Sequence, residues 1–131
     1  MLGTFSLMTV AARVASAQGV NCTSPGSAAQ KSICADADLK ALDAKMVSLY
    51  AEASRTGSTV KNEIAAQQRQ WIESREACGT QKDVKACLTA AYTSRNEALA
   101  RYATKTSAMK NSSRFDAAMT ANLSRSSSGV V

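Results

Sequence analysis

Apolar residues recur at spacings of three and four along three stretches of the chain, which is the pattern of helices that bury one face. The first stripe is Leu39, Leu42, Met46, Leu49 and Ala53. The second is Val60, Ile64, Gln67, Trp71 and Cys78. The third is Val84, Leu88, Ala91, Leu99 and Tyr102, with Tyr92 and Arg95 flanking it. No stretch alternates with the period of two that a strand requires, so the pattern predicts an all-α fold.

Residues with known preferences for helix ends divide these stripes. The predicted N-caps of the three long helices are Asp36, Thr59 and Asp83. Ser24 followed by Pro25 predicts a short leading helix that runs to Ile33, and Gly79 ends the second long helix. Residues 55–59 interrupt the apolar pattern with glycine and hydroxyl residues and predict a turn. Because the loops are short, we expect a small three-helix antiparallel bundle with a short leading helix.

The two ends of the chain differ from the domain between them. Residues 1–17 are mostly apolar and end in Ala-Ser-Ala, which predicts a signal peptide cleaved after Ala17. This signal is atypical because no Lys or Arg precedes the apolar run and Arg13 lies within it. Residues 18–104 form the predicted domain, and residues 105–131 form a basic, Ser-rich tail that is predicted to be flexible. No other segment approaches the roughly 18 apolar residues of a membrane span.

The formal net charge of +6 comes largely from outside the predicted domain. Residues 18–104 carry eleven basic and nine acidic residues, a balance of +2, whereas the tail carries four basic residues and one acidic residue, a balance of +3. The domain therefore lacks the clustered cations and aromatic stacking partners of a nucleic-acid surface, and we expect no nucleic-acid partner.

Four cysteines in so small a domain require an explanation. They are Cys22, Cys34, Cys78 and Cys87. In an exported chain they meet an oxidising compartment, which predicts two disulfides. Antiparallel helices bring all four to one end of the bundle. We favour the pairs 22–34 and 78–87, since each joins sequence neighbours across one turn, although the other two pairings remain open. A zinc site is disfavoured by the wide spacing and by the absence of histidine.

The missing residue types also restrict the chemistry. Without histidine the chain has no imidazole base and no Ser-His or Cys-His nucleophile, and it has no glycine-rich phosphate loop. We therefore expect no enzyme, no catalytic residue, no metal and no cofactor.

Trp71 is the single tryptophan, and its place in the apolar stripe predicts the main ring of the core, with the indole nitrogen bonded to a polar neighbour. An exposed anchor in a partner interface is the alternative. Arg75, one turn further on, is predicted to stack on this ring or to pair with an acidic residue such as Asp43. Glu73 and Glu76 are predicted to face solvent.

Several motifs occur in an order that resembles a known family. They are Cys-Ala-Asp-Ala-Asp-Leu at 34–39, Leu42-Asp43, Tyr50, Gln-Arg-Gln-Trp-Ile-Glu-Ser-Arg-Glu-Ala-Cys at 68–78, Cys87-Leu88, Tyr92 and Arg95. Over residues 21–102 the chain resembles the LprI-like lysozyme-inhibitor family, a group of bacterial exported helical domains stapled by cysteines. The resemblance implies a shared constellation of Asp43, Tyr50, Gln68, Trp71 and Arg75. We interpret it as architectural: an aromatic centre, an Asp–Arg pair and two disulfides.

The resemblance implies a protein partner, a lysozyme, whose cleft would be blocked. Glycoside hydrolysis depends on two carboxylates. A polar turn at the end opposite the cysteines, carrying an arginine that can meet a carboxylate, is the predicted contact. It consists of Arg55, Thr56, Gly57, Ser58 and Thr59. The basic tail argues against this reading, because animal lysozymes are usually basic too.

The alternative is a periplasmic or cell-envelope protein-binding module with no lysozyme target. An exposed apolar patch on the third helix around Tyr92 and Leu99 would favour it. A third reading is a structural exported protein without a single tight partner. In each case the expected location is periplasmic or secreted.

Overall fold

The computed structural model describes residues 19–127, so the predicted signal peptide at 1–17 lies outside the described residues. The helices are α1 (Ala28–Ala35), α2 (Ala37–Ala53), α3 (Ser58–Ala77), the 3-10 helix η1 (Cys78–Thr80) and α4 (Val84–Ser127). No strand occurs among the described residues. The predicted all-α class with two disulfides is therefore confirmed.

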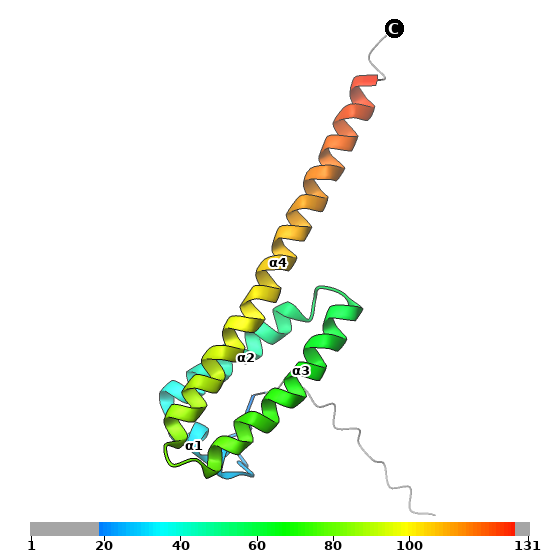
Figure 1. Ribbon diagram of the computed structural model, residues 1–131. Helices are drawn as coiled ribbons and strands as arrows, with labels where there is room; N and C mark the ends of the chain where they lie inside the picture. The colour runs from blue at the N-terminus through cyan, green and yellow to red at the C-terminus, as the bar shows by residue number, and fades with distance from the viewer. Residues whose placement is uncertain (1–18, 128–131) are drawn as a thin grey trace, which may run out of the picture.

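The arrangement differs in detail from three helices with a leader. The helices α2, α3 and α4 run beside one another, and α1 lies at the end where the chain passes from α3 to α4 (Figure 1). Since α1 contacts α2, α3, η1 and α4, it is a fourth element of the packed fold.

Two of the predicted helix caps are present. Asp36 accepts hydrogen bonds from the backbone N–H groups of Asp38 and Leu39 at the start of α2. Asp83 accepts one from Ala86 at the start of α4. Each side chain thus satisfies donors that the first helical turn leaves without a partner.

The other two predicted helix starts are wrong. The short leading helix begins at Ala28 with Ser27 as its cap, three residues after the predicted Ser24. The predicted cap Thr59 already lies inside α3, which follows Gly57 with no side-chain cap. Gly57 has φ 142°, a left-handed conformation that favours glycine, so the turn closes there and the helix cap lies two residues earlier than predicted.

Residues 105–131 were predicted to form a flexible tail after the domain, but α4 continues to Ser127 and projects beyond the rest of the molecule (Figure 1). Residues 84–127 contain no glycine or proline, so nothing in this stretch breaks the helix. Along this part of α4, side-chain hydroxyl groups donate hydrogen bonds to the backbone carbonyl four residues earlier. They belong to Thr104, Thr106, Ser107 and Thr120. Residues 107–126 are all exposed. The predicted tail is thus helical from residue 105 to 127, while its flexibility and the domain limits stay predictions.

The core lies between α1, α2, α3 and α4. Its fully buried side chains include Ile33, Leu39, Met46, Leu88 and Leu99, and the largest is Tyr92.

Within residues 19–127, none of the helices combines the length and the apolar content that a membrane span needs.

Both disulfides lie at the α1 end of the bundle. Cys22 is bonded to Cys34, and Cys78 to Cys87, which is the pairing favoured from the sequence. The first fastens the segment before α1 to its last turn, and the second ties η1 to the first turn of α4. At Gly79 an added Cβ would lie 2.9 Å from the Ala29 nitrogen, so only glycine allows η1 to approach α1 this closely.

Candidate partner-binding site

Asp43 on α2 is the centre of a buried polar network. Its carboxylate accepts a hydrogen bond from the Tyr92 hydroxyl at 2.7 Å and another from the Val20 backbone N–H at 2.9 Å. At Gly19 an added Cβ would lie 2.1 Å from the carboxylate, so a side chain there would prevent this approach. Burial, and then the bond to Asp43, raises the pKa of Tyr92. The network joins the segment before α1 to α2 and α4.

A second network surrounds Gln68 on α3. Its side-chain oxygen accepts from Arg95 Nε at 2.8 Å, and its amide donates to Met46 Sδ at 3.1 Å. Arg95 also donates to the Ile64 carbonyl, and burial lowers the pKa of its guanidinium. The sequence placed Arg95 at the flank of the apolar stripe, but only 6% of it is exposed. Its position one turn after Tyr92 is the signal that places it on the buried face.

Trp71 is half-buried and is not the main ring of the core. Its indole N–H donates to the Ala91 carbonyl at 3.0 Å, and its ring meets the edge of Tyr92 at a centroid distance of 5.1 Å. Arg75 lies 5.5 Å from the ring centroid, so the stacking predicted from the sequence is present. The central position belongs to Tyr92 because its hydroxyl reaches Asp43, whereas the larger indole needs the acceptor on α4 at the edge of the core.

The predicted pair of Asp43 with Arg75 is not formed. Arg75 is buried and makes its ion pair with Glu76 at 2.7 Å. Glu76, which was predicted to face solvent, also accepts hydrogen bonds from the Ser27 hydroxyl and the Gln30 amide. This carboxylate therefore joins α3 to the first turn of α1.

Glu76→Gln is expected to lower the free energy of unfolding by about 1–2 kcal/mol at pH 7, since charged hydrogen bonds become neutral. Burial raises the pKa of Glu76, but bonds from Ser27 and Arg75 outweigh it and the net pKa is lowered from 4.5. The stabilisation is thus present above pH 4.5 and is lost as the pH falls. Urea unfolding of both proteins between pH 3 and 7 measures this; a constant difference between them would contradict it.

These networks join helices that are far apart in the sequence. Tyr50, the remaining member of the constellation, is half-buried against the core. No group of three or more side chains suited to a metal ion occurs in the part of the chain that the structure describes. The architectural role of the constellation stays a prediction.

The turn between α2 and α3 is exposed at the end opposite the disulfides (Figure 1). Arg55 is exposed and joins no ion pair among residues 19–127. The Thr56 hydroxyl donates to the Ala53 carbonyl at 2.8 Å, which fixes the turn to the last turn of α2. Of the five predicted contact residues, Ser58 and Thr59 belong to the first turn of α3. Arg55, Thr56 and Gly57 form the turn itself.

A groove of about 800 Å³ lies beside this turn, between the first turns of α3 and the projecting half of α4. Val60 and Glu63 line one wall. Tyr102, Lys105, Met109, Lys110 and Arg114 line the other. The sequence analysis missed this groove because it placed residues from 105 onward in a tail. The second wall of the groove exists only because α4 continues through these residues.

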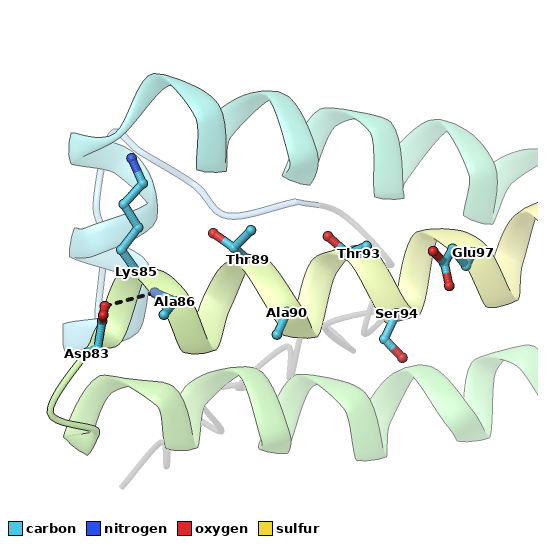
Figure 2. Close-up of a pocket in the computed structure, with 8 residues that line it drawn as sticks. All are labelled: Asp83, Lys85, Ala86, Thr89, Ala90, Thr93, Ser94 and Glu97. Atoms are coloured by element: carbon cyan, nitrogen blue, oxygen red, sulfur yellow. Dashed lines mark hydrogen bonds between the residues drawn. The ribbon is translucent and has the colours of Figure 1, made fainter.

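The outward face of α4 is a second, shallower surface, where the helix runs between α2 and α3 (Figure 2). It carries small and polar residues such as Thr89, Ala90 and Thr93. An exposed apolar patch around Tyr92 and Leu99, which would have favoured a binding module, is not present, since both residues are fully buried. The large exposed apolar side chains lie further along α4, at Met109, Phe115, Met119 and Leu123.

Comparison with known proteins finds one match, which covers part of the chain. The sequence model of the family described as lysozyme inhibitor LprI matches residues 22–83, from the first cysteine to the residue before α4. The resemblance seen in the sequence is thereby confirmed over that segment, which includes the turn and the first disulfide but not α4. No curated protein and no solved structure matches the chain significantly.

Proposed function

We propose that this chain, whose residues 22–83 match the lysozyme inhibitor LprI, is an exported protein that binds a lysozyme and blocks its cleft. The family match is the observation that carries the proposal. Two disulfides suit an oxidising compartment, which supports a periplasmic or secreted location. Blocking a cleft requires complementary shape and charge and no catalytic group, so the proposal includes no enzymatic activity.

The turn of Arg55, Thr56 and Gly57 is the proposed contact. It lies at the end of the bundle opposite the disulfides, and both flanking helices pack into the core through Ala53 and Ile64. An arginine there can form two parallel hydrogen bonds with a carboxylate. A cleft that hydrolyses glycosides presents two carboxylates, so Arg55 has a partner of suitable chemistry.

Arg55→Ala is expected to weaken inhibition of cell-wall lysis by about tenfold or more, because truncating one partner of a buried charge pair costs on the order of 2–5 kcal/mol. Lysozyme-catalysed lysis with increasing amounts of the oxidised chain measures the inhibition constant. Arg69→Ala is the matched control, since Arg69 is an exposed arginine in the middle of α3, away from the turn.

Two results would count against this proposal in different ways. Inhibition that is equal in wild type and Arg55→Ala would place the contact elsewhere on the surface. No inhibition by folded, oxidised protein at micromolar excess would remove the activity for the lysozymes tested.

A periplasmic or cell-envelope protein-binding module with no lysozyme target is the second candidate. It is favoured by the projecting half of α4, where Met109, Phe115, Met119 and Leu123 are 56–69% exposed. Apolar side chains of this size on one unpacked helix are typical of interaction surfaces. This part of the chain also lies outside the segment that matches the lysozyme-inhibitor family.

A further inference from the structure

The projecting half of α4 carries three large apolar side chains that no other part of the described chain covers (Figure 1). They are Phe115, Met119 and Leu123, and 69%, 56% and 65% of them is exposed. We propose that this apolar stripe binds the same stripe of a second copy of the chain, with the two helices antiparallel and the two Met119 side chains facing each other. The proposal does not rest on lysozyme inhibition, since none of the three side chains lines the groove beside the Arg55 turn.

The rotation of the helix places the three side chains on one face. Successive residues are turned by about 100°, so Phe115 and Leu123 lie about 40° to either side of Met119. A two-fold axis that passes through Met119, perpendicular to the helix, brings Phe115 of one copy level with Leu123 of the second copy on both sides of the axis. The stripe is therefore complementary to itself. Met109 lies about 80° from Met119 and lines the groove instead.

Most charged side chains of the projecting half lie outside this contact. Three of its four cations are turned by about 120–180° from Met119. They are Lys110, Arg114 and Arg125. Asp116 lies at the edge of the stripe, about 60° from Met119, and the two-fold axis keeps the two Asp116 residues about 9 Å apart along the helices. A lipid surface fits less well than a second helix, because cations on the far face would point away from anionic headgroups when the stripe is inserted.

The projecting half is long enough for two helices to meet without contact between the two domains. From Met119 the described helix continues for eight residues to Ser127, which is about 12 Å. The end of the second helix therefore lies level with about residue 111. Residues 107–126 are all exposed, so the packed part of α4 ends before this point. The fourth cation, Lys105, is about 21 Å from Met119 along the axis and lies beyond the described end of the second helix.

The area of the contact indicates its strength. Three side chains at these exposed fractions, each with about 200 Å² of surface, bury about 400 Å² per copy and about 800 Å² in total. Interfaces below about 1,200 Å² are typical of transient complexes, so we expect a reversible dimer with Kd of about 10–100 µM. At about 1 µM the chain is then monomeric, and unfolding measured there does not depend on the contact.

Sedimentation equilibrium of the oxidised chain from about 5 to 300 µM brackets the expected Kd and measures the association. We expect the average mass to rise from that of one chain towards that of two. We also expect Kd to fall as salt is raised, because the two projecting halves carry the same net charge and salt screens their repulsion. The mass of a single chain over the whole concentration range would overturn the proposal.

Two lysine variants locate the contact. Met119→Lys places two cations opposite each other at the two-fold axis and is expected to raise Kd at least tenfold. Ala121→Lys is the matched control, because it adds the same charge at an exposed residue about 160° from Met119 and is expected to leave Kd within about threefold. Equal effects of the two variants would overturn the proposed face. So would binding to vesicles of anionic phospholipid by a chain that stays monomeric, which would assign the stripe to lipid.

A spin label tests the orientation of the two helices. Nitroxides on Lys105→Cys are expected about 42 Å apart along the axes of an antiparallel pair, whereas a parallel pair places them level with each other. Pulsed electron paramagnetic resonance at a concentration above Kd measures this distance. A distance below about 25 Å would overturn the antiparallel arrangement, because adjacent helix axes are only about 8–10 Å apart.

Discussion

Reduction of both disulfides is expected to unfold most of the packed helices at 25 °C. Each bridge closes a short loop, with sequence separations of 12 and 9, and is worth about 2–4 kcal/mol in the chain-entropy description. Together they approach the net stability of about 5 kcal/mol at the low end for small domains. Without them, the segment before α1 is released and η1 is no longer tied to α4.

Urea titrations of the oxidised and reduced chain measure this loss. Trp71 is the only tryptophan, and it lies against Tyr92 and Arg75, so its fluorescence reports the packed region. Circular dichroism alone is less informative, since the projecting half of α4 adds helical signal without packing. The variants C22S/C34S and C78S/C87S separate the two bridges. A reduced protein with the urea midpoint of the oxidised one would show that the core is sufficient without them.

Tyr92→Ala is expected to lower the free energy of unfolding by about 3–5 kcal/mol, the range for removal of a buried aromatic ring. Tyr92 is fully buried, contacts Trp71 edge to face, and donates the hydrogen bond that neutralises much of the cost of burying Asp43. Tyr92→Phe keeps the ring and is expected to cost about 1–3 kcal/mol, because Asp43 loses a donor. Urea unfolding measures both changes.

The control for this prediction is on the same helix. Phe115 is 69% exposed on the projecting half of α4, so Phe115→Ala is expected to change the stability by less than about 0.5 kcal/mol. A loss in Phe115→Ala as large as in Tyr92→Ala would mean that the projecting helix packs against something in solution. Equal stability of wild type and Tyr92→Ala would contradict the central role of this ring.

Because of the Tyr92 hydroxyl, the free energy of unfolding is expected to depend on pH in the alkaline range. The pKa of Tyr92 is raised above 10 in the folded protein, first by burial and then by Asp43, so the unfolded chain loses its proton at a lower pH. Stability is therefore retained below pH 10 and falls as the pH rises beyond it. The difference between wild type and Tyr92→Phe is expected to shrink over that range.

The spacing of apolar residues was sufficient to predict the fold class and most of the core residues. The stripes predicted Leu39, Met46, Ile64, Leu88 and Leu99 as inward residues, and all five are buried. Helix caps were predictable where a side chain accepts hydrogen bonds from the first helical turn, as at Asp36 and Asp83. They were not predictable where the backbone decides, as at Gly57, whose left-handed φ sets the start of α3.

Polar partners were harder to predict, because several residues compete for one position. The sequence paired Asp43 with Arg75 across two helices, but the closer Tyr92 and Val20 occupy the carboxylate, and Arg75 is adjacent to Glu76. A buried polar group must be satisfied, but the identity of its partner depends on distances of a few tenths of an ångström. Helical spacing does not resolve such distances.

The sequence by itself determined an all-α chain, the caps of two helices, two disulfides and the likeness of residues 22–83 to the lysozyme inhibitor LprI. Periodicity, residue type and motif order are properties of the chain. Only the tertiary structure decided which ring is central, which residues pair with Asp43 and Glu76, and where a groove opens. These depend on residues more than 20 positions apart meeting across different helices, and local patterns do not encode such contacts.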